Sequence, residues 1–346
     1  MINRSLLALS ILIALFSCNS NSAPSYSEQP LGWELKETPV KSSLRGLSAV
    51  TAEIVWASGS GGTWLKTLDG GETWEHGVIA GLDTVDFRSI HAFDAMNAVV
   101  VSAGQPAVIY KTSDGGASWG LKYQEEDELA FFDGIAFPSP DLGYVIGDPL
   151  EGKWTILKSA NQGESWYPID SLPVAEPGEA AFAASATSLV AAGNQIWLGT
   201  GGTASKMHYS SDGGSSWTQV KSPFVQGESS QGIFSLANLG SGQIVAVGGD
   251  YLDEPMREGV AANFLSSTGE WVPAQEAPGG YRSGVSYFSM QKWLIAVGPG
   301  GSDYSKDGGL TWEAFSGEGF HAVKMGQADG SVWASGSEGR VGKLLY

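Results

Sequence analysis

The sequence contains a single cysteine, Cys18, among 346 residues. The chain therefore cannot form an internal disulfide or a metal site built on several cysteines, and its folded part has no cysteine that could act as a nucleophile. Charged residues are also scarce at 16%, and basic ones most of all: 19 Lys and Arg stand against 37 Asp and Glu, a formal net charge of −18. A surface of this sign repels phosphate backbones and anionic head groups, so we expect no binding of nucleic acid and no flat docking on a membrane.

Signals for cofactors are lacking as well. None of the four histidines is paired with another at a spacing typical of metal ligands. The glycine clusters follow predicted hairpin strands and open no helix, which excludes a dinucleotide fingerprint. We therefore expect neither a metal nor an organic cofactor.

The one long apolar run is Leu6–Phe16, which follows Arg4. It is too short to span a bilayer and has the length of a signal-peptide core. Leu15–Cys18 (LFSC) then resembles a bacterial lipobox, a resemblance that implies a signal peptide over residues 1–17 and lipidation of Cys18. The alternative is cleavage by an ordinary signal peptidase, with Cys18 left free. Residues 18–30, rich in Asn, Ser and Pro, are predicted to be a flexible tether to the cell envelope, periplasmic or surface-facing.

What the chain has in abundance is glycine, with 48 residues, and tryptophan, with 13. Much of both belongs to one repeated pattern, Ser/Thr-x-Asp-x-Gly-x-x-Trp. Full copies occur at Thr67–Trp74, Thr112–Trp119, Ser210–Trp217 and Ser305–Trp312, a variant with Asn161 in place of Asp at Ser159–Trp166, and a shortened copy at Ser266–Trp271. Four full copies indicate a repeat architecture.

The chemistry of this octapeptide is that of a tight turn between two strands. Its Asp accepts hydrogen bonds from backbone N–H groups ahead of it, and its Gly supplies a positive φ. Its Trp buries a large ring between neighbouring sheets. We therefore predict a structural role for the residues at the Asp position, which are Asp69, Asp114, Asn161, Asp212 and Asp307.

Short apolar strands precede every copy in the same order. In the first unit they are residues 44–50, 53–58 and 63–67, and a fourth strand begins at Trp74. In the fourth unit Ala180–Ser185 is predicted to be the first strand. The seventh unit has only three strands before the chain ends at Tyr346, and Trp33–Lys36 fits its missing fourth strand. The prediction is an all-β protein: a seven-bladed β-propeller of four-stranded antiparallel blades over residues 31–346, closed by an N-terminal strand that completes the last blade.

These repeats resemble the BNR/Asp-box class, and their layout resembles the photosystem II stability/assembly factor-like propellers over residues 31–346. The segments Gly178–Ser185 (GEAAFAAS) and Tyr144–Pro149 (YVIGDP) resemble bacterial members that carry a lipoprotein signal. Plant and cyanobacterial members of that family are assembly chaperones that bind partner proteins. Asp-box propellers also include sialidases and other glycosidases, so the resemblance by itself does not decide the function.

A candidate site follows from the blade order, because the first strand of each blade lines the central channel. Alignment of these strands places a polar residue near the start of each: Arg45, Arg88, Asp133, Glu179, Gln231, Arg282 and His321. The loops between second and third strands open on the same face and contribute Asp148 and Asp250 with Tyr251. We call this face the channel mouth, and guanidinium groups there suit a carboxylate ligand. Alternatively, the column forms only ion pairs between adjacent blades.

The absence of a catalytic signature favours a non-enzymatic binding or assembly module, tethered at the envelope. We expect a protein partner or a small anionic ligand, and a monomer attached to the membrane only through Cys18. The alternative is a glycoside hydrolase of sialidase type, in which Arg45, Arg88 and Arg282 would bind the substrate carboxylate. The Arg-Ile/Leu-Pro motif of that family is missing here. Another propeller enzyme acting on an anionic substrate, or a purely structural propeller, also stays open.

Overall fold

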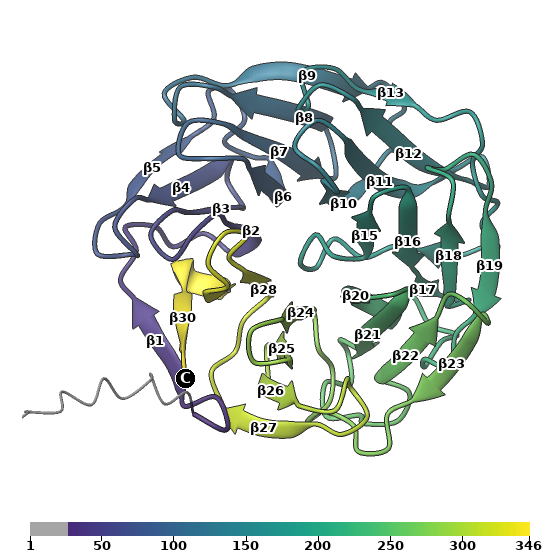
Figure 1. Cartoon of the computed structure of the whole chain (residues 1–346). Coiled ribbons are helices and arrows are strands. Elements are labelled where there is room, and N and C mark those ends of the chain that lie inside the picture. Colours follow the sequence, from purple (N-terminus) through teal and green to yellow (C-terminus); the bar gives the residue numbers. More distant parts are fainter. Residues whose placement is uncertain (1–26) are drawn as a thin grey trace, which may run out of the picture.

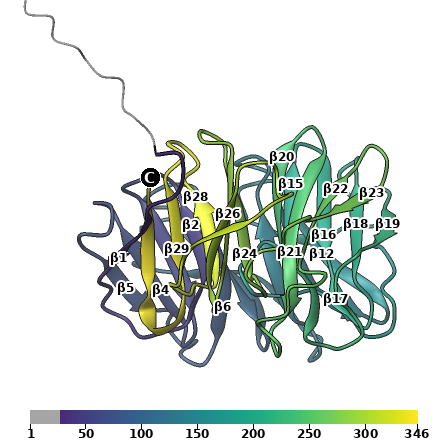
Figure 2. The ribbon, with the colours of Figure 1, turned by 90° about the horizontal axis from the view of Figure 1, so that it is seen from below.

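The computed structural model describes residues 27–346. The predicted signal peptide, the lipidation site at Cys18 and most of the predicted tether lie outside the described residues. Seven antiparallel sheets surround a central channel (Figure 1), and turning the molecule by 90° shows that the strands run across the thickness of a disc (Figure 2). No helix within residues 27–346 is long and apolar enough to cross a membrane.

Each blade contributes four strands, ordered from the channel outward. Blade one is β2 (Leu44–Ala49), β3 (Val55–Gly59), β4 (Thr63–Thr67) and β5 (Glu75–Val78); blade two is β6 (Asp86–Ala92), β7 (Ala98–Ala103), β8 (Ala107–Thr112) and β9 (Gly120–Glu125); blade three is β10 (Phe132–Ala136), β11 (Gly143–Leu150), β12 (Lys153–Ser159) and β13 (Tyr167–Pro168). Blade four is β15 (Leu189–Ala192), β16 (Gln195–Gly199), β18 (Lys206–Ser210) and β19 (Thr218–Lys221); blade five is β20 (Gln231–Gly240), β21 (Gln243–Asp250), β22 (Ala261–Leu265) and β23 (Glu270–Pro273). Blade six is β24 (Gly284–Phe288), β25 (Trp293–Gly298), β26 (Gly301–Ser305) and β27 (Glu313–Ser316); blade seven is β28 (Ala322–Met325), β29 (Val332–Ser335), β30 (Val341–Leu345) and β1 (Gly32–Lys36). A 3-10 turn, η1 (Ser337–Gly339), precedes β30.

The ring closes as the sequence predicts. Strand β1 pairs antiparallel with β30, from Gly32 opposite Leu345 to Lys36 opposite Val341, so residues from both chain ends share blade seven. The Trp33 ring packs 5.0 Å from that of Phe320, and its indole nitrogen donates to Ser302 Oγ at 3.0 Å, in blade six. Because the first strand of the chain pairs with the last, it supplies the outermost strand of blade seven, which thereby has four strands like the other blades.

The core lies between the blades. Between blades two and three, for example, Val99, Val101 and Ile109 pack against Val145 and Leu157, all of them buried. The second strand of a blade is covered on both faces by its neighbours, and this explains its nearly continuous apolar sequence. This repeated packing sets the first strands around the channel, so the channel mouth is built on rigid elements.

The first strand of blade four was predicted wrongly. Ala180–Ser185 was expected to form it, but β15 begins at Leu189. Instead, β14 (Glu179–Ala180) pairs with β17 (Gly201–Gly202), which extends the sheet of blade five to six strands. Ala186 then forms an isolated bridge with Gly134 of blade three. These contacts hold the apolar segment as a loop at the channel mouth, where its small residues pack closely without being a strand.

A candidate binding site at the channel mouth

A cavity of about 440 Å³ opens at the channel mouth, a size within the usual range for small-molecule sites. Its walls come from all seven blades, with the loop before β15 counted as part of blade four, and fall into chemical groups. They are basic or imidazole groups (Arg45, Arg88, His321), acids (Asp148, Glu254), aromatic rings (Phe131, Phe182, Phe234, Tyr251, Tyr281) and small residues (Ala181, Ala183, Ala184, Pro299). The cavity thus joins residues that lie more than 270 positions apart in the sequence.

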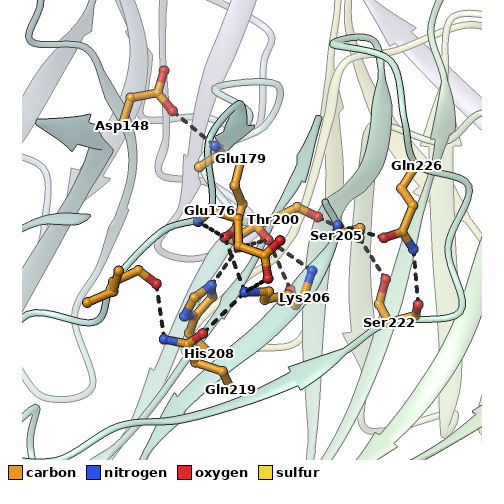
Figure 3. A network of polar contacts seen from close by, with 12 residues as sticks. Asp148, Glu176, Glu179, Thr200, Ser205, Lys206, His208, Gln219, Ser222 and Gln226 are labelled. Carbon is orange, nitrogen blue, oxygen red and sulfur yellow. Dashed lines mark hydrogen bonds and ion pairs between the residues drawn. The ribbon is translucent and has the colours of Figure 1, made fainter. Parts of the chain in front are cut away.

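The loop that replaces the expected first strand of blade four forms one wall of this cavity. Asp148 Oδ1 accepts a hydrogen bond from Ala181 N at 3.0 Å (Figure 3). From blade one, Arg45 Nη1 reaches Ala184 O at 3.4 Å. Residues of blades one and three therefore hold a loop that has no strand partner of its own at residues 181–185.

Two guanidinium groups lie close together in the cavity. Arg88 Nε donates to Asp86 Oδ2 at 2.7 Å, whereas Arg45 contacts only the Ala184 carbonyl. Burial lowers the pKa of Arg45, and the charge of Arg88 lowers it further, but a guanidinium stays protonated at neutral pH. Within the described part of the chain, Arg88 therefore has an ion-pair partner and Arg45 has none.

His321 is the third member of this group, and it is neutral. Its Nε2 lies 3.0 Å from Ser337 Oγ and 3.2 Å from Ser43 Oγ, and its Nδ1 is buried with no hydrogen bond. Burial lowers the pKa of His321 to about 3, and the nearby arginines add to the shift. It therefore contributes a hydrogen-bonding group and no charge at pH 7.

Aromatic rings form the wall supplied by blades four to six. The rings of Phe182 and Phe234 stack with centroids 3.7 Å apart, and Tyr281 meets Phe234 edge-on at 4.8 Å. Tyr251 joins the same group and is 43% exposed. Burial raises the pKa of Tyr281, so its hydroxyl is protonated at neutral pH. This wall offers apolar faces beside the charged groups.

Two carboxyl groups of blade three lie next to the arginines. Asp148 lines the cavity, and burial raises its pKa to about 6. Asp133 is fully buried behind it, and burial together with the charge of Asp148 raises the pKa of Asp133 well above its usual range. Neither oxygen of Asp133 has a hydrogen-bond partner.

Glu179, also predicted for this site, lies off the cavity in a satisfied network (Figure 3). Its Oε1 accepts from Thr200 Oγ1 at 2.6 Å and lies 2.7 Å from His208 Nε2, and its Oε2 accepts from Glu176 N at 2.9 Å. Burial raises the pKa of Glu179, but the contact with His208 and the hydrogen bonds from Thr200 Oγ1 and Glu176 N together outweigh it, so the net shift is downward. The network ties β14 to β18.

Arg282 and Asp250 also lie off the cavity. Arg282 is buried and pairs with Asp303 of β26, within its own blade. Asp250 accepts hydrogen bonds from Gln231 Nε2 at 3.0 Å and from Leu252 N at 2.8 Å. Of the predicted column, Arg45, Arg88 and His321 therefore line the cavity. The ion pairs of Arg88 and Arg282 lie within blades, not between adjacent blades as the alternative required.

Most of the aromatic wall and one acid were not predicted from the sequence: Phe131, Phe182, Phe234, Tyr281 and Glu254. Two of them had a readable signal, since Phe131 directly precedes β10 and Tyr281 lies three residues before β24. Phe182 and Glu254 lie in loops whose path depends on contacts with other blades, so no local pattern marks them.

The Asp-box turns lie on the opposite face, because they join third to fourth strands. In the first box, Asp69 Oδ1 accepts from Thr73 N at 2.9 Å and from Thr67 Oγ1 at 2.8 Å, and Oδ2 from Thr73 Oγ1 at 2.6 Å. These hydrogen bonds lower the pKa of Asp69 to about 2. Asp114, Asp212 and Asp307 repeat the pattern, and Asn161 keeps the contacts to Ser159 Oγ and Ser165 N. Among residues 27–346, no cluster of three or more His, Cys, Asp or Glu could hold a metal ion.

The known proteins that resemble this chain do so mainly in their fold. A family model described as photosynthesis system II assembly factor YCF48 matches residues 25–125. No curated protein matches the chain. Among solved structures, YCF48 bound to a D1 peptide superposes with a TM-score of 0.65 at 16% identity, covering 94% of this chain and 100% of that one. YCF48 from Cyanidioschyzon merolae gives 0.62 at 17% identity, covering 90% and 98%.

A glycosidase also appears among the similar structures. The GH74 xyloglucanase from Xanthomonas campestris gives a TM-score of 0.62 at 14% identity and covers 90% of this chain but 53% of the enzyme. Identities this low establish the fold alone. The chain is thus a seven-bladed propeller of BNR type that resembles photosystem II assembly factors in its repeats and architecture.

Proposed function

We propose that this protein is an envelope-tethered propeller that binds a partner protein at the channel mouth and serves as an assembly module. The partner presents a carboxylate-bearing segment to Arg45 and Arg88, and lipidated Cys18 keeps the propeller at the membrane. The resemblance to YCF48, which has been solved with a D1 peptide bound, supports a protein as partner.

The observation that carries the proposal is the guanidinium group of Arg45, which lines the cavity and forms no ion pair with any residue of 27–346. In a chain with a formal charge of −18, nearby acids are abundant, yet Arg45 contacts a carbonyl instead of a carboxylate. Guanidinium groups bind carboxylates through paired, charge-assisted hydrogen bonds, and partial burial strengthens these by excluding water. A free guanidinium beside a second one in a cavity is therefore suited to an anionic group from outside.

The test is crosslinking in intact cells followed by capture of the protein with the double substitution Arg45→Ala and Arg88→Ala. Arg257→Ala is the matched control, since Arg257 bonds the carbonyls of Ala277 and Pro278 away from the cavity. We expect one specific partner to be lost from the double variant and kept by the control. Equal capture by all three proteins, each verified as folded, would refute binding through the arginines.

The anchor can be tested in the same cells. Replacing Cys18 by Ser removes the acceptor thiol, so the protein should move from the membrane fraction to the soluble fraction. A variant that stays in the membrane fraction would contradict the proposed lipid anchor without affecting the cavity proposal.

A second candidate is a glycoside hydrolase that acts on an anionic sugar. One observation favours it: Tyr281 and Glu254 line the same cavity as the two arginines, and a Tyr nucleophile with a Glu partner is the arrangement that sialidases use. The third arginine proposed for the substrate carboxylate, Arg282, is instead paired with Asp303. Release of a fluorescent phenol from a sialoside is the test, and absence of turnover would exclude this activity.

A further inference from the structure

The cavity has an acidic side that the proposed function does not use. Asp148 Oδ1 accepts one hydrogen bond, from Ala181 N, and its Oδ2 accepts none within residues 27–346. Glu254, from the loop after β21, also lines the cavity, and its carboxylate makes no hydrogen bond or ion pair with any described residue. Two carboxylates therefore face the cavity without a cation of their own.

A third carboxyl group, that of Asp133, lies near Asp148 but does not line the cavity. Phe132 pairs with Gly147 and Gly134 with Ile146, so Asp133 is the extra residue of a β-bulge, a device that redirects a side chain. Its carboxyl group is completely buried, has no hydrogen-bond partner, and interacts electrostatically with Asp148 and Arg88, both of which line the cavity. A buried carboxyl group that pairs with nothing is costly to keep.

The aromatic wall lines the same cavity as the arginines and the acids. Phe234 and Tyr281 are buried, and Tyr251 is partly exposed at the rim. Aromatic faces accept apolar groups and also attract cations. A group that fills the cavity therefore meets cationic, apolar and acidic surfaces.

We infer that the cavity recognises a zwitterionic group on an apolar body, with its carboxylate on Arg45 and Arg88 and an ammonium or guanidinium on Asp148 and Glu254. The binding of a carboxylate by Arg45 and Arg88 rests on the proposed function. The binding of a cationic group by Asp148 and Glu254 goes beyond it. The partner segment that enters the cavity accordingly carries a Lys or Arg side chain, or a free amino group, beside its carboxylate and an apolar residue.

Two small molecules can test the carboxylate contact and the cation contact of the cavity separately. L-Phenylalanine carries both charges, and 3-phenylpropionate has the same ring and carboxylate but lacks the ammonium group. Ligand-observed NMR titrations of the full chain at pH 7.5 would measure both dissociation constants. We expect wild-type protein to prefer L-phenylalanine by about tenfold, the usual scale for one charge-assisted hydrogen bond.

Asp148→Asn should abolish this preference, because it removes the charge and keeps an oxygen that can accept from Ala181 N. Asp170→Asn is the matched control, since Asp170 is exposed and lies outside the cavity. Glu254→Gln, in a surface loop, provides a second variant should Asp148→Asn fold poorly, and it should reduce the preference.

The outcomes are distinguishable from those of the capture experiment. Equal affinities for the two probes, a preference that survives both acid substitutions, or no binding of either probe would each overturn the zwitterion inference. Binding of 3-phenylpropionate that is lost in the Arg45→Ala, Arg88→Ala variant would still support the binding of a carboxylate by these arginines. Partner capture decides the proposed function independently of any probe.

Discussion

The Asp-box turns and the channel mouth both contain carboxyl groups, but the surroundings of these groups shift their pKa in opposite directions. In a box, Asp69 is solvent-exposed and receives hydrogen bonds from its own turn, so its pKa falls to about 2. At the mouth, Asp133 is fully buried and receives none, and its pKa rises. The first arrangement satisfies the turn within eight residues of sequence. The second leaves a carboxyl group with no hydrogen-bond partner among the described residues, which favours its protonated form.

The same contrast separates the arginines of one predicted column. Arg282 has its carboxylate partner inside blade six, whereas Arg45 reaches into the cavity and contacts a backbone carbonyl. A charged residue that is satisfied inside the fold contributes to stability. A charged residue without such a partner is available to bind a ligand, and the difference between the two kinds can be measured as a change in unfolding free energy.

The largest effect is expected for Arg282→Ala. Removing Arg282 leaves Asp303 buried without its cation, which should cost about 3–5 kcal/mol of unfolding free energy. Arg45→Ala should cost about 1 kcal/mol or less, because little is left unsatisfied. Urea denaturation followed by tryptophan fluorescence measures both. Similar losses in the two variants would refute the division into structural and recognition arginines.

A smaller effect, with a characteristic pH dependence, is expected for Asp133→Asn. The pKa of Asp133 is raised in the folded state, so its contribution to stability is fully present below its unfolded pKa of about 3.9 and is lost as the pH rises toward the folded pKa. Asn cannot titrate. The variant should therefore gain stability relative to wild type between pH 4 and pH 8.

Unfolding free energies at pH 4.5, 6 and 8 test this prediction. Asp148, whose folded pKa is about 6, titrates in the same range, and the charge of Arg88 acts on Asp133. Asp148→Asn combined with Asp133→Asn therefore serves as the reference in which neither acid responds. A difference between wild type and Asp133→Asn that does not change with pH would contradict burial of an unpaired carboxyl group.

The smallest effect is expected in the box of blade three, where Asn161 replaces the usual Asp. Asn161 already accepts from Ser165 N at 3.1 Å, so Asn161→Asp changes mainly the charge. The new carboxylate should have a depressed pKa, as in Asp114 at about 2. Its stabilisation is then present above pH 4 and is lost as the pH falls toward 2.

Thermal unfolding at pH 6 and pH 2.5 measures this change. The variant should melt slightly above wild type at pH 6 and show a smaller advantage at pH 2.5. The stability gain of Asp133→Asn is expected to grow with pH. A gain of Asn161→Asp that is larger at pH 2.5 than at pH 6 would have the opposite pH dependence and would contradict hydrogen bonding of an ionised carboxylate in the box.

Much of the fold was readable from local sequence. The boxes, the Trp at the start of each fourth strand and the completion of blade seven by Trp33–Lys36 were all predicted, and the pairing of β1 with β30 confirms the closure. The failure at Ala180–Ser185 has a physical cause. Its small apolar residues suit a strand, but Glu179 is held by Thr200 and His208, and Asp148 holds Ala181. These partners lie in other strands, so no local pattern could identify them.

The sequence by itself determined the architecture, because each box satisfies its own turn and each strand carries its own apolar pattern, and both depend on residues only a few positions apart. It also placed Arg45, Arg88, Asp148 and His321 on one face. Tertiary structure alone decided which charged groups face the cavity and which are paired inside a blade. That outcome depends on distances between residues of different strands and blades, such as Arg282 with Asp303 and Arg45 with Ala184, and those distances exist only once the ring has closed.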